Sequence, residues 1–183
     1  LTDIDPVMVF TVIGIILAAV FVAMVISILL SIFIWNPLEV GCQKFFINCK
    51  YGNAELGDIA YGFKNGYAHI GMIMFLRGLF TGLWMLLFII PGIVKSYEYM
   101  MIPYLLAEHP EMTRQEAFAE SKQMMDGNKW DAFVLDLSFI GWTLLGVCTF
   151  GILLVFYVEP YIYLTRAELY HLSLIHISEP TRP

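Results

Sequence analysis

The sequence has few charges and no cysteine spacing that suits a metal site or a disulfide framework. Only 14% of its 183 residues are charged, whereas 59% are hydrophobic, a composition far from that of a water-soluble domain. With a formal net charge of -6, the chain has no basic stripe for a phosphate backbone, so nucleic acid is not expected as a partner. The three cysteines are an odd number without CxxC spacing, which predicts small apolar residues rather than ligands.

Motifs of conventional catalysis are also absent from the sequence. There is no HExxH, GxSxG, glycine-rich phosphate loop or CxxC, and the histidines are scattered along the chain. The nearest approach to a cluster, Glu108-His109-Pro110-Glu111, is typical of a solvated loop. We therefore predict no catalytic residues, no metal and no cofactor. An intramembrane enzyme is the least favoured alternative, and a cavity that joins Asp136 to a histidine would be the observation in its favour.

Long apolar runs are what the sequence has instead, with a mean hydropathy of +0.73. Residues 7–35 carry no charge and would form a helix about 43 Å long, which exceeds a hydrocarbon core of about 30 Å. No basic segment precedes this run, so it is not a signal peptide, and we expect the natural chain to begin upstream of Leu1. Asn36-Pro37 predicts the end of this span and the start of an interfacial helix over 37–50.

The apolar stretch 93–107 decides the predicted topology. Residues 67–90 form a second span that contains Arg77. If 93–107 does not cross the membrane, lysine and arginine divide almost evenly between the two sides. If it crosses, they share one face and leave only Lys95 at the other, which is the arrangement that the positive-inside rule favours. We therefore predict a hairpin with its tip at Pro91-Gly92 and the positive face in the cytoplasm.

The polar segment after this hairpin carries strong helix signals. Thr113 followed by Glu116 forms a capping box, and Gly127 is a stop signal. These signals predict a short amphipathic helix over 113–126 on the cytoplasmic face. Its apolar side chains form a candidate face for docking a partner protein, namely Phe118, Met124 and Met125.

Two further apolar segments, 130–147 and 151–171, are separated by a short turn and predict a second hairpin. A single span over 137–158 is the alternative, which would leave the chain from residue 160 onward, with Arg166, on the outer side.

The C-terminal segment, residues 172–183, does not continue the sequence pattern of the helix predicted before it. Residues 172–183, which include LSLIHISEPTR, continue no earlier pattern and resemble the translated read-through of a sequencing adapter, so we exclude them as an artefactual tail. The fold predicted for residues 1–171 is a single all-α domain, a polytopic transmembrane helical bundle with short interfacial helices. Its spans are 7–35, 67–90, 93–107, 130–147 and 151–171.

Charged residues within predicted spans are the first candidates for function, because they are expensive in a membrane. An ion pair across two helices is the simplest account of Arg77 and Asp136. Alternatively, Arg77 extends toward the interface while Asp136 meets a backbone donor. Lys95 and Glu98 are three residues apart, share a helix face and can pair at the membrane boundary. Together these four residues form a candidate intramembrane polar site.

Several uncommon sequence motifs follow one another along the chain in the order that they have in a known protein family. IIPGI, SKQMMDGNKW and LDLSFIGW lie between Phe75 and Gly146, with NPLEVG before them and PYxxxTxAxxY, from Pro160 to Tyr170, after them. In these strings the chain resembles the bacterial membrane family called domain of unknown function 975. The resemblance implies a multi-pass protein of the bacterial cytoplasmic membrane with a further N-terminal helix, and it implies no activity.

Two hypotheses of function follow from these features. The first is a non-enzymatic module that binds or helps to move lipid or another amphipathic molecule, because Arg77 and Asp136 lie in spans next to an amphipathic helix. The second is a membrane scaffold or assembly component whose helix over 113–126 docks a membrane protein partner or a second copy of the chain. In both, the lipid bilayer surrounds the protein.

Overall fold

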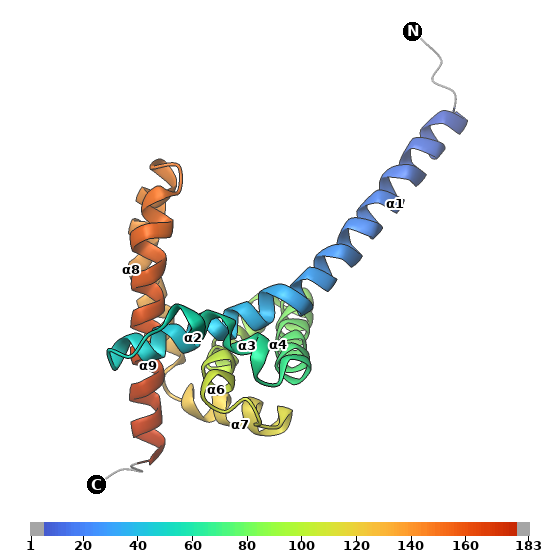
Figure 1. Ribbon diagram of the computed structural model, residues 1–183. Coiled ribbons are helices and arrows are strands. Elements are labelled where there is room, and N and C mark those ends of the chain that lie inside the picture. The colour runs from blue at the N-terminus through green and yellow to red at the C-terminus, as the bar shows by residue number, and fades with distance from the viewer. Residues whose placement is uncertain (1–5, 179–183) are drawn as a thin grey trace.

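Every regular element in the described part of the chain is a helix. The computed structural model describes residues 6–178, with side chains up to residue 175. Figure 1 shows a central body of short helices from which two arms project, one formed by α1 and the other by α8 with the first half of α9. The elements are α1 (Pro6–Leu30), η1 (Ser31–Trp35), α2 (Asn36–Lys50), η2 (Leu56–Ala60), α3 (Tyr61–Lys64), α4 (Tyr67–Leu87), α5 (Ile89–Glu98), α6 (Ile102–Glu108), α7 (Arg114–Met124), α8 (Lys129–Cys148), η3 (Leu154–Val158) and α9 (Glu159–Ser178).

The sequence predicted that the first helix ends at Asn36-Pro37, but the helix continues through Pro37. The chain is helical without a break over Pro6–Lys50, although a proline removes one backbone donor and clashes with the carbonyl four residues earlier, here that of Phe33. The π turn η1 widens the helix just before Pro37, which absorbs the clash. The Tyr67 hydroxyl donates a 2.7 Å hydrogen bond to the freed Phe33 oxygen. The helix axis changes direction at this point (Figure 1).

The predicted interfacial helix over 37–50 is α2, and it lies within the body of the protein. It contacts α3, α4, α6 and α9 and buries Val40 and Ile47. Its approach to the following segment is so close that a Cβ on Gly41 would collide with the Ile59 carbonyl, and a Cβ on Gly62 with the Pro37 carbonyl. Two glycines therefore permit backbone-to-backbone packing along one side of α2.

The segment 93–107, which was predicted as a span, is not a single helix. The chain folds back at Phe88, three residues before the predicted tip, and α5 packs against α4. Gly92 makes this contact tight, since a Cβ there would lie 2.6 Å from the Met85 Cα. The chain leaves the helical conformation between α5 and α6. These helices are about 15 Å and about 10 Å long, so each is shorter than the thickness of a hydrocarbon core. Residues 102–107 are all buried.

The core of the body forms where α2, α4, α6, α7 and α9 meet. Tyr104 on α6 stacks on Tyr170 of α9 with ring centroids 5.4 Å apart, and the Tyr170 hydroxyl donates to Glu108 at 2.7 Å. Lys50 at the end of α2 forms a 2.8 Å ion pair with Glu168. These contacts join the long helix α9 to the short helices of the body.

The second predicted hairpin is present as a pair of packed helices. A turn at Phe150, where φ is +53°, reverses the chain, and Gly146 of α8 lies against Leu154 of η3. Pro160 again follows a π turn, η3, so both prolines inside long helices are accommodated in the same way. The alternative of a single helix over 137–158 is wrong, because α8 ends at Cys148.

The signals for the amphipathic helix are confirmed by α7. The Thr113 hydroxyl accepts from the Glu116 backbone amide at 3.4 Å, while the Glu116 carboxylate accepts from the Thr113 amide at 2.9 Å. The hydrogen bonds that the Thr113 amide and hydroxyl donate to this carboxylate lower the pKa of Glu116 below its ordinary value. Gly127, with φ of +83°, turns the chain toward α8.

Three helices are long and apolar enough to cross a membrane, namely Pro6–Lys50, Tyr67–Leu87 and Lys129–Cys148. The segments 93–107 and 151–171 are not among them. All of α1 is exposed, and a helix that is apolar on every side and covered by no protein fits a lipid environment.

We expect Gly41→Ala to destabilise the protein by at least the roughly 1–3 kcal/mol that overpacking costs, because the added methyl meets backbone rather than a movable side chain. The measurement is the midpoint of thermal unfolding in detergent. Gly14→Ala is the matched control, since nothing lies within 4 Å of its position in α1. Equal midpoints for the two variants would contradict the close packing of α2.

Candidate functional site

Arg77 of α4 pairs with Glu39 of α2, and not with Asp136. The Arg77 guanidinium donates to the Glu39 carboxylate at 2.8 Å, with side chains 25% and 37% exposed. The predicted ion pair across two helices therefore exists for Arg77 with a different partner. Because both charges belong to long apolar helices, each would be costly to leave alone.

Asp136 of α8 lies at the centre of a second polar contact. Arg166 of α9 donates to one carboxylate oxygen at 2.9 Å, and the Tyr97 hydroxyl of α5 donates to the other at 3.0 Å. Burial and the neighbouring carboxylate raise the pKa of Tyr97 to about 12, so the phenol stays protonated and remains a donor. This triad of Tyr97, Asp136 and Arg166 connects three helices.

A buried tyrosine lies near both ion pairs. The Tyr104 side chain is 1% exposed, and burial raises the pKa of its hydroxyl, with further influence from the charges of Arg166, Glu39 and Arg77. Among the described residues its hydroxyl has no hydrogen-bond partner, and neither does the Oε1 of Gln43, one turn after Glu39 on α2.

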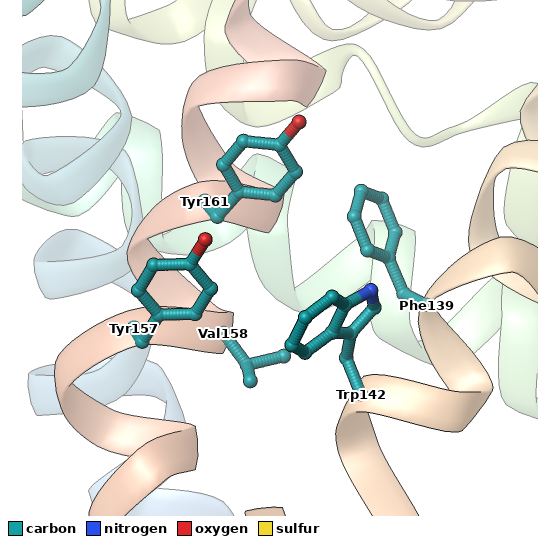
Figure 2. Close-up of a pocket in the computed structure, with 5 residues that line it drawn as sticks. All are labelled: Phe139, Trp142, Tyr157, Val158 and Tyr161. Atoms are coloured by element: carbon teal, nitrogen blue, oxygen red, sulfur yellow. The ribbon is translucent and has the colours of Figure 1, made fainter.

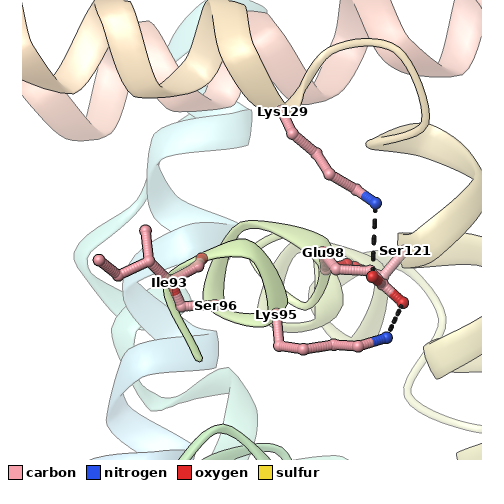
Figure 3. Close-up of polar contacts among 6 residues, drawn as sticks. All are labelled: Ile93, Lys95, Ser96, Glu98, Ser121 and Lys129. Atoms are coloured by element: carbon pink, nitrogen blue, oxygen red, sulfur yellow. Dashed lines mark hydrogen bonds and ion pairs between the residues drawn. The ribbon is translucent and has the colours of Figure 1, made fainter. Parts of the chain in front are cut away.

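Lys95 and Glu98 form the predicted ion pair on one face of α5, and a second lysine joins it (Figure 3). The Lys95 Nζ lies 2.8 Å from one Glu98 oxygen, and the Lys129 Nζ lies 3.4 Å from the other. Burial alone would raise the pKa of Glu98, but hydrogen bonds and charge from Lys95 and then Lys129 lower it overall. Ser121 donates to the Glu98 backbone carbonyl at 2.8 Å and holds α7 against this point.

An apolar hollow opens directly beside this charge cluster. We call it the α5–α8 groove; its volume is about 330 Å³, within the range of about 300–1,000 Å³ typical of small-molecule sites. Five of its seven lining side chains are apolar, and the other two are the tyrosine of the triad and the second lysine of the cluster. The lining consists of Ile90, Ile93, Val94, Tyr97, Lys129, Trp130 and Phe133.

The predicted docking face on α7 is wrong, because its apolar side chains point inward. Met124 and Met125 are 1% and 0% exposed. Phe118 packs edge-on against Tyr99 and Phe80, with centroids 4.9 Å and 5.7 Å apart. The apolar positions of this helix pack into the core. The sequence pattern of an amphipathic helix is the same whether its apolar face packs inside the protein or docks another protein.

Sequence reasoning missed four residues of these contacts. Glu39, Tyr97 and Lys129 were not predicted from the sequence, and Arg166 entered only in the alternative of a single span over 137–158. The available signal was that Glu39 follows the uncharged run 7–35 by four residues and that Arg166 lies within the predicted span 151–171. No group of three or more potential metal ligands occurs within residues 6–178.

Comparison with known proteins gives one finding. The family model described as "Protein of unknown function (DUF975)" matches residues 9–175, which confirms the resemblance seen in the motifs. Neither the curated proteins nor the solved structures contain a match.

A double-mutant cycle should show Asp136 coupled to Arg166 and not to Arg77. For Asp136→Asn with Arg166→Gln we expect an interaction energy within about 0.5–3 kcal/mol, as for groups in one ion pair. For Asp136→Asn with Arg77→Gln we expect additivity to within about 0.5 kcal/mol, because the two share no partner. The measurement is the free energy of unfolding in mixed micelles, and strong coupling in the second cycle would reject this pairing.

Glu98→Gln should lower the stability of the fold by an amount that depends on pH. A carboxyl with a lowered pKa in the folded state stabilises the protein above the ordinary glutamate pKa of about 4.3, and this stability is lost as the pH falls through the folded value. The unfolding midpoint of the variant should therefore lie below that of the wild type at pH 7, and the difference should shrink at acidic pH. Asp126→Asn, at an exposed position, is the control; a difference for Glu98→Gln that is independent of pH would contradict the assignment.

Proposed function

We propose that this chain, which belongs to the DUF975 family of proteins of unknown function, is a multi-pass protein of the bacterial cytoplasmic membrane that binds an anionic lipid without transforming it. The acyl chain lies in the α5–α8 groove and the headgroup lies at Lys129. The observation that carries the proposal is the lining of the groove, in which an apolar trough ends at a lysine.

The exposed helices support a membrane setting for this groove. Three helices have the length and hydropathy to cross a bilayer, and the whole of α1 is exposed apolar surface. The groove shares this character, since Ile90 and Trp130 on its rim are 76% and 69% exposed. A lipid can therefore enter sideways from the bilayer without crossing water.

The balance of charge at the end of the groove favours an anionic headgroup. Two lysines share one buried carboxylate, so the cluster of Lys95, Glu98 and Lys129 has an excess of one positive charge. The longer of the two ion pairs, at 3.4 Å, is that of Lys129, which also lines the groove. Lys129 is thus the ammonium available to a phosphate oxygen, while Lys95 keeps Glu98 neutralised.

The same groups suit binding better than catalysis. The Lys95 ammonium is paired with the Glu98 carboxylate. It also lies over the rings of Trp84 and Tyr99, 5.9 Å and 5.7 Å from their centroids. Tyr97 donates its proton to Asp136. Charged groups fixed in this way orient a ligand.

We expect Lys129→Gln to weaken binding of phosphatidylglycerol by roughly ten- to hundredfold, since a hydrogen bond to a charged group contributes about 1.5–3 kcal/mol. Binding of phosphatidylcholine should change little. Val94→Trp fills the groove and should weaken binding of phosphatidylglycerol. The measurement is native mass spectrometry of the protein released from nanodiscs that contain the two lipids in equal amounts.

Lys122→Gln on the exposed side of α7 is the matched control, because it removes the same charge away from the groove. Equal loss of phosphatidylglycerol in Lys122→Gln and Lys129→Gln would show general attraction to the basic face and contradict a site in the groove. Unchanged lipid retention in Val94→Trp would contradict the proposed path of the acyl chain.

A further inference from the structure

A second cavity lies on the arm formed by α8 and the start of α9, and its walls are aromatic. Its volume is about 140 Å³, and it is lined by Phe139 and Trp142 of α8 together with Tyr157, Val158 and Tyr161 of the facing helix. Figure 2 shows the two tyrosines on one side of the space and the phenylalanine and tryptophan on the other. We call these four rings the aromatic cage.

The cage has a closed floor and an open mouth. Phe139 and Val158 are 8% and 2% exposed and form the floor, whereas Trp142, Tyr157 and Tyr161 are each between 50% and 55% exposed and form the rim. A small group can therefore enter between the rim residues and reach the floor, while a chain attached to that group stays outside.

The spacing of the rings suits a positively charged group. Centroids lie 5.7 Å apart for Phe139 and Tyr161, 6.3 Å for Tyr161 and Tyr157, and 6.0 Å for Tyr157 and Trp142. A cation is attracted to an aromatic ring when it lies over the ring face within about 6 Å of the centroid, and a group in this cavity lies next to all four rings that line it. Tyr157 and Tyr161 are four residues apart, so the helix itself places both rings on one face.

The arm has a net negative charge, which attracts a cation. Between Trp130 and His171 the carboxylates Asp131, Asp136, Glu159 and Glu168 outnumber the one basic residue, Arg166. Arg166 is held in its ion pair with Asp136 and does not line the cavity. No lysine or arginine therefore repels a cation from the cage.

We propose that the aromatic cage binds a quaternary ammonium group, carried on an amphipathic or small organic cation. A primary ammonium brings three N–H donors that need acceptors, and leaving them unpaired in an apolar cavity is costly. A quaternary ammonium has no such donors, and ring faces replace its weak hydration. This site is separate from the α5–α8 groove and does not depend on the lipid proposed there.

The test uses choline and 3,3-dimethylbutan-1-ol, which have the same shape but differ in charge. Binding of each to the full chain in an uncharged maltoside detergent is measured by saturation-transfer NMR titration. We expect choline to bind at least threefold more tightly than the alcohol. Equal or weaker binding of choline would show a merely apolar cavity and overturn the proposal.

Variants of the cage locate the site. Trp142→Leu and Tyr161→Leu should each weaken choline binding by roughly two- to thirtyfold, the range for one cation–π contact, whereas Tyr161→Phe keeps the ring and should bind as the wild type does. Trp35→Leu is the control, because it removes the same kind of side chain at an exposed position that lines neither the cage nor the α5–α8 groove.

Folding is checked by the unfolding midpoint, and retention of phosphatidylglycerol should be the same in Trp142→Leu as in the wild type. A loss of choline binding in Trp35→Leu equal to that in Trp142→Leu would overturn the proposal. So would undiminished binding in Tyr161→Leu.

Discussion

Accommodation of Pro37 inside a continuous helix is the constraint on which the rest of the body depends. The π turn before it and the Tyr67 hydroxyl satisfy the backbone that the proline disturbs, so α2 continues from α1 in a new direction. With this bend, α2 lies where α3, α4, α6 and α9 can all reach it. The close contacts at Gly41 and Gly62 then fix its position, because backbone cannot move aside as a side chain can.

Charge in the apolar helices is organised by pairing across the bundle. Arg77 is neutralised by Glu39, and Asp136 by Arg166, which removes the cost of isolated charges. On α8, Lys129 and Phe133 line the α5–α8 groove, Asp136 follows within one turn, and Phe139 and Trp142 line the aromatic cage. One helix therefore carries the lysine of the proposed anion site and two rings of the proposed cation site, separated by a carboxylate that is already paired.

Local signals in the sequence predicted local structure well and long-range structure less well. The capping box at Thr113 and the stop at Gly127 are confirmed, because their physics involves neighbouring residues only. The end predicted at Pro37 was wrong, and the sequence did not reveal that the segment 93–107 divides between two helices. Tertiary contacts decide whether a proline bends or ends a helix and where an apolar run breaks. For the polar site, Lys95 with Glu98 followed from helix spacing, whereas the partners of Arg77 and Asp136 come from helices distant in sequence.

The two π turns tie the orientation of the arms to the prolines that follow them. Each turn holds one residue more than an α-helical turn, and one residue corresponds to about 100° of rotation about the helix axis. Deleting one residue between Ser31 and Trp35 would convert the π turn to an α turn and rotate α1 about its own axis, but it would also restore the clash of Pro37 with the carbonyl four residues before it. The face that α1 presents to its surroundings is therefore set together with the start of α2.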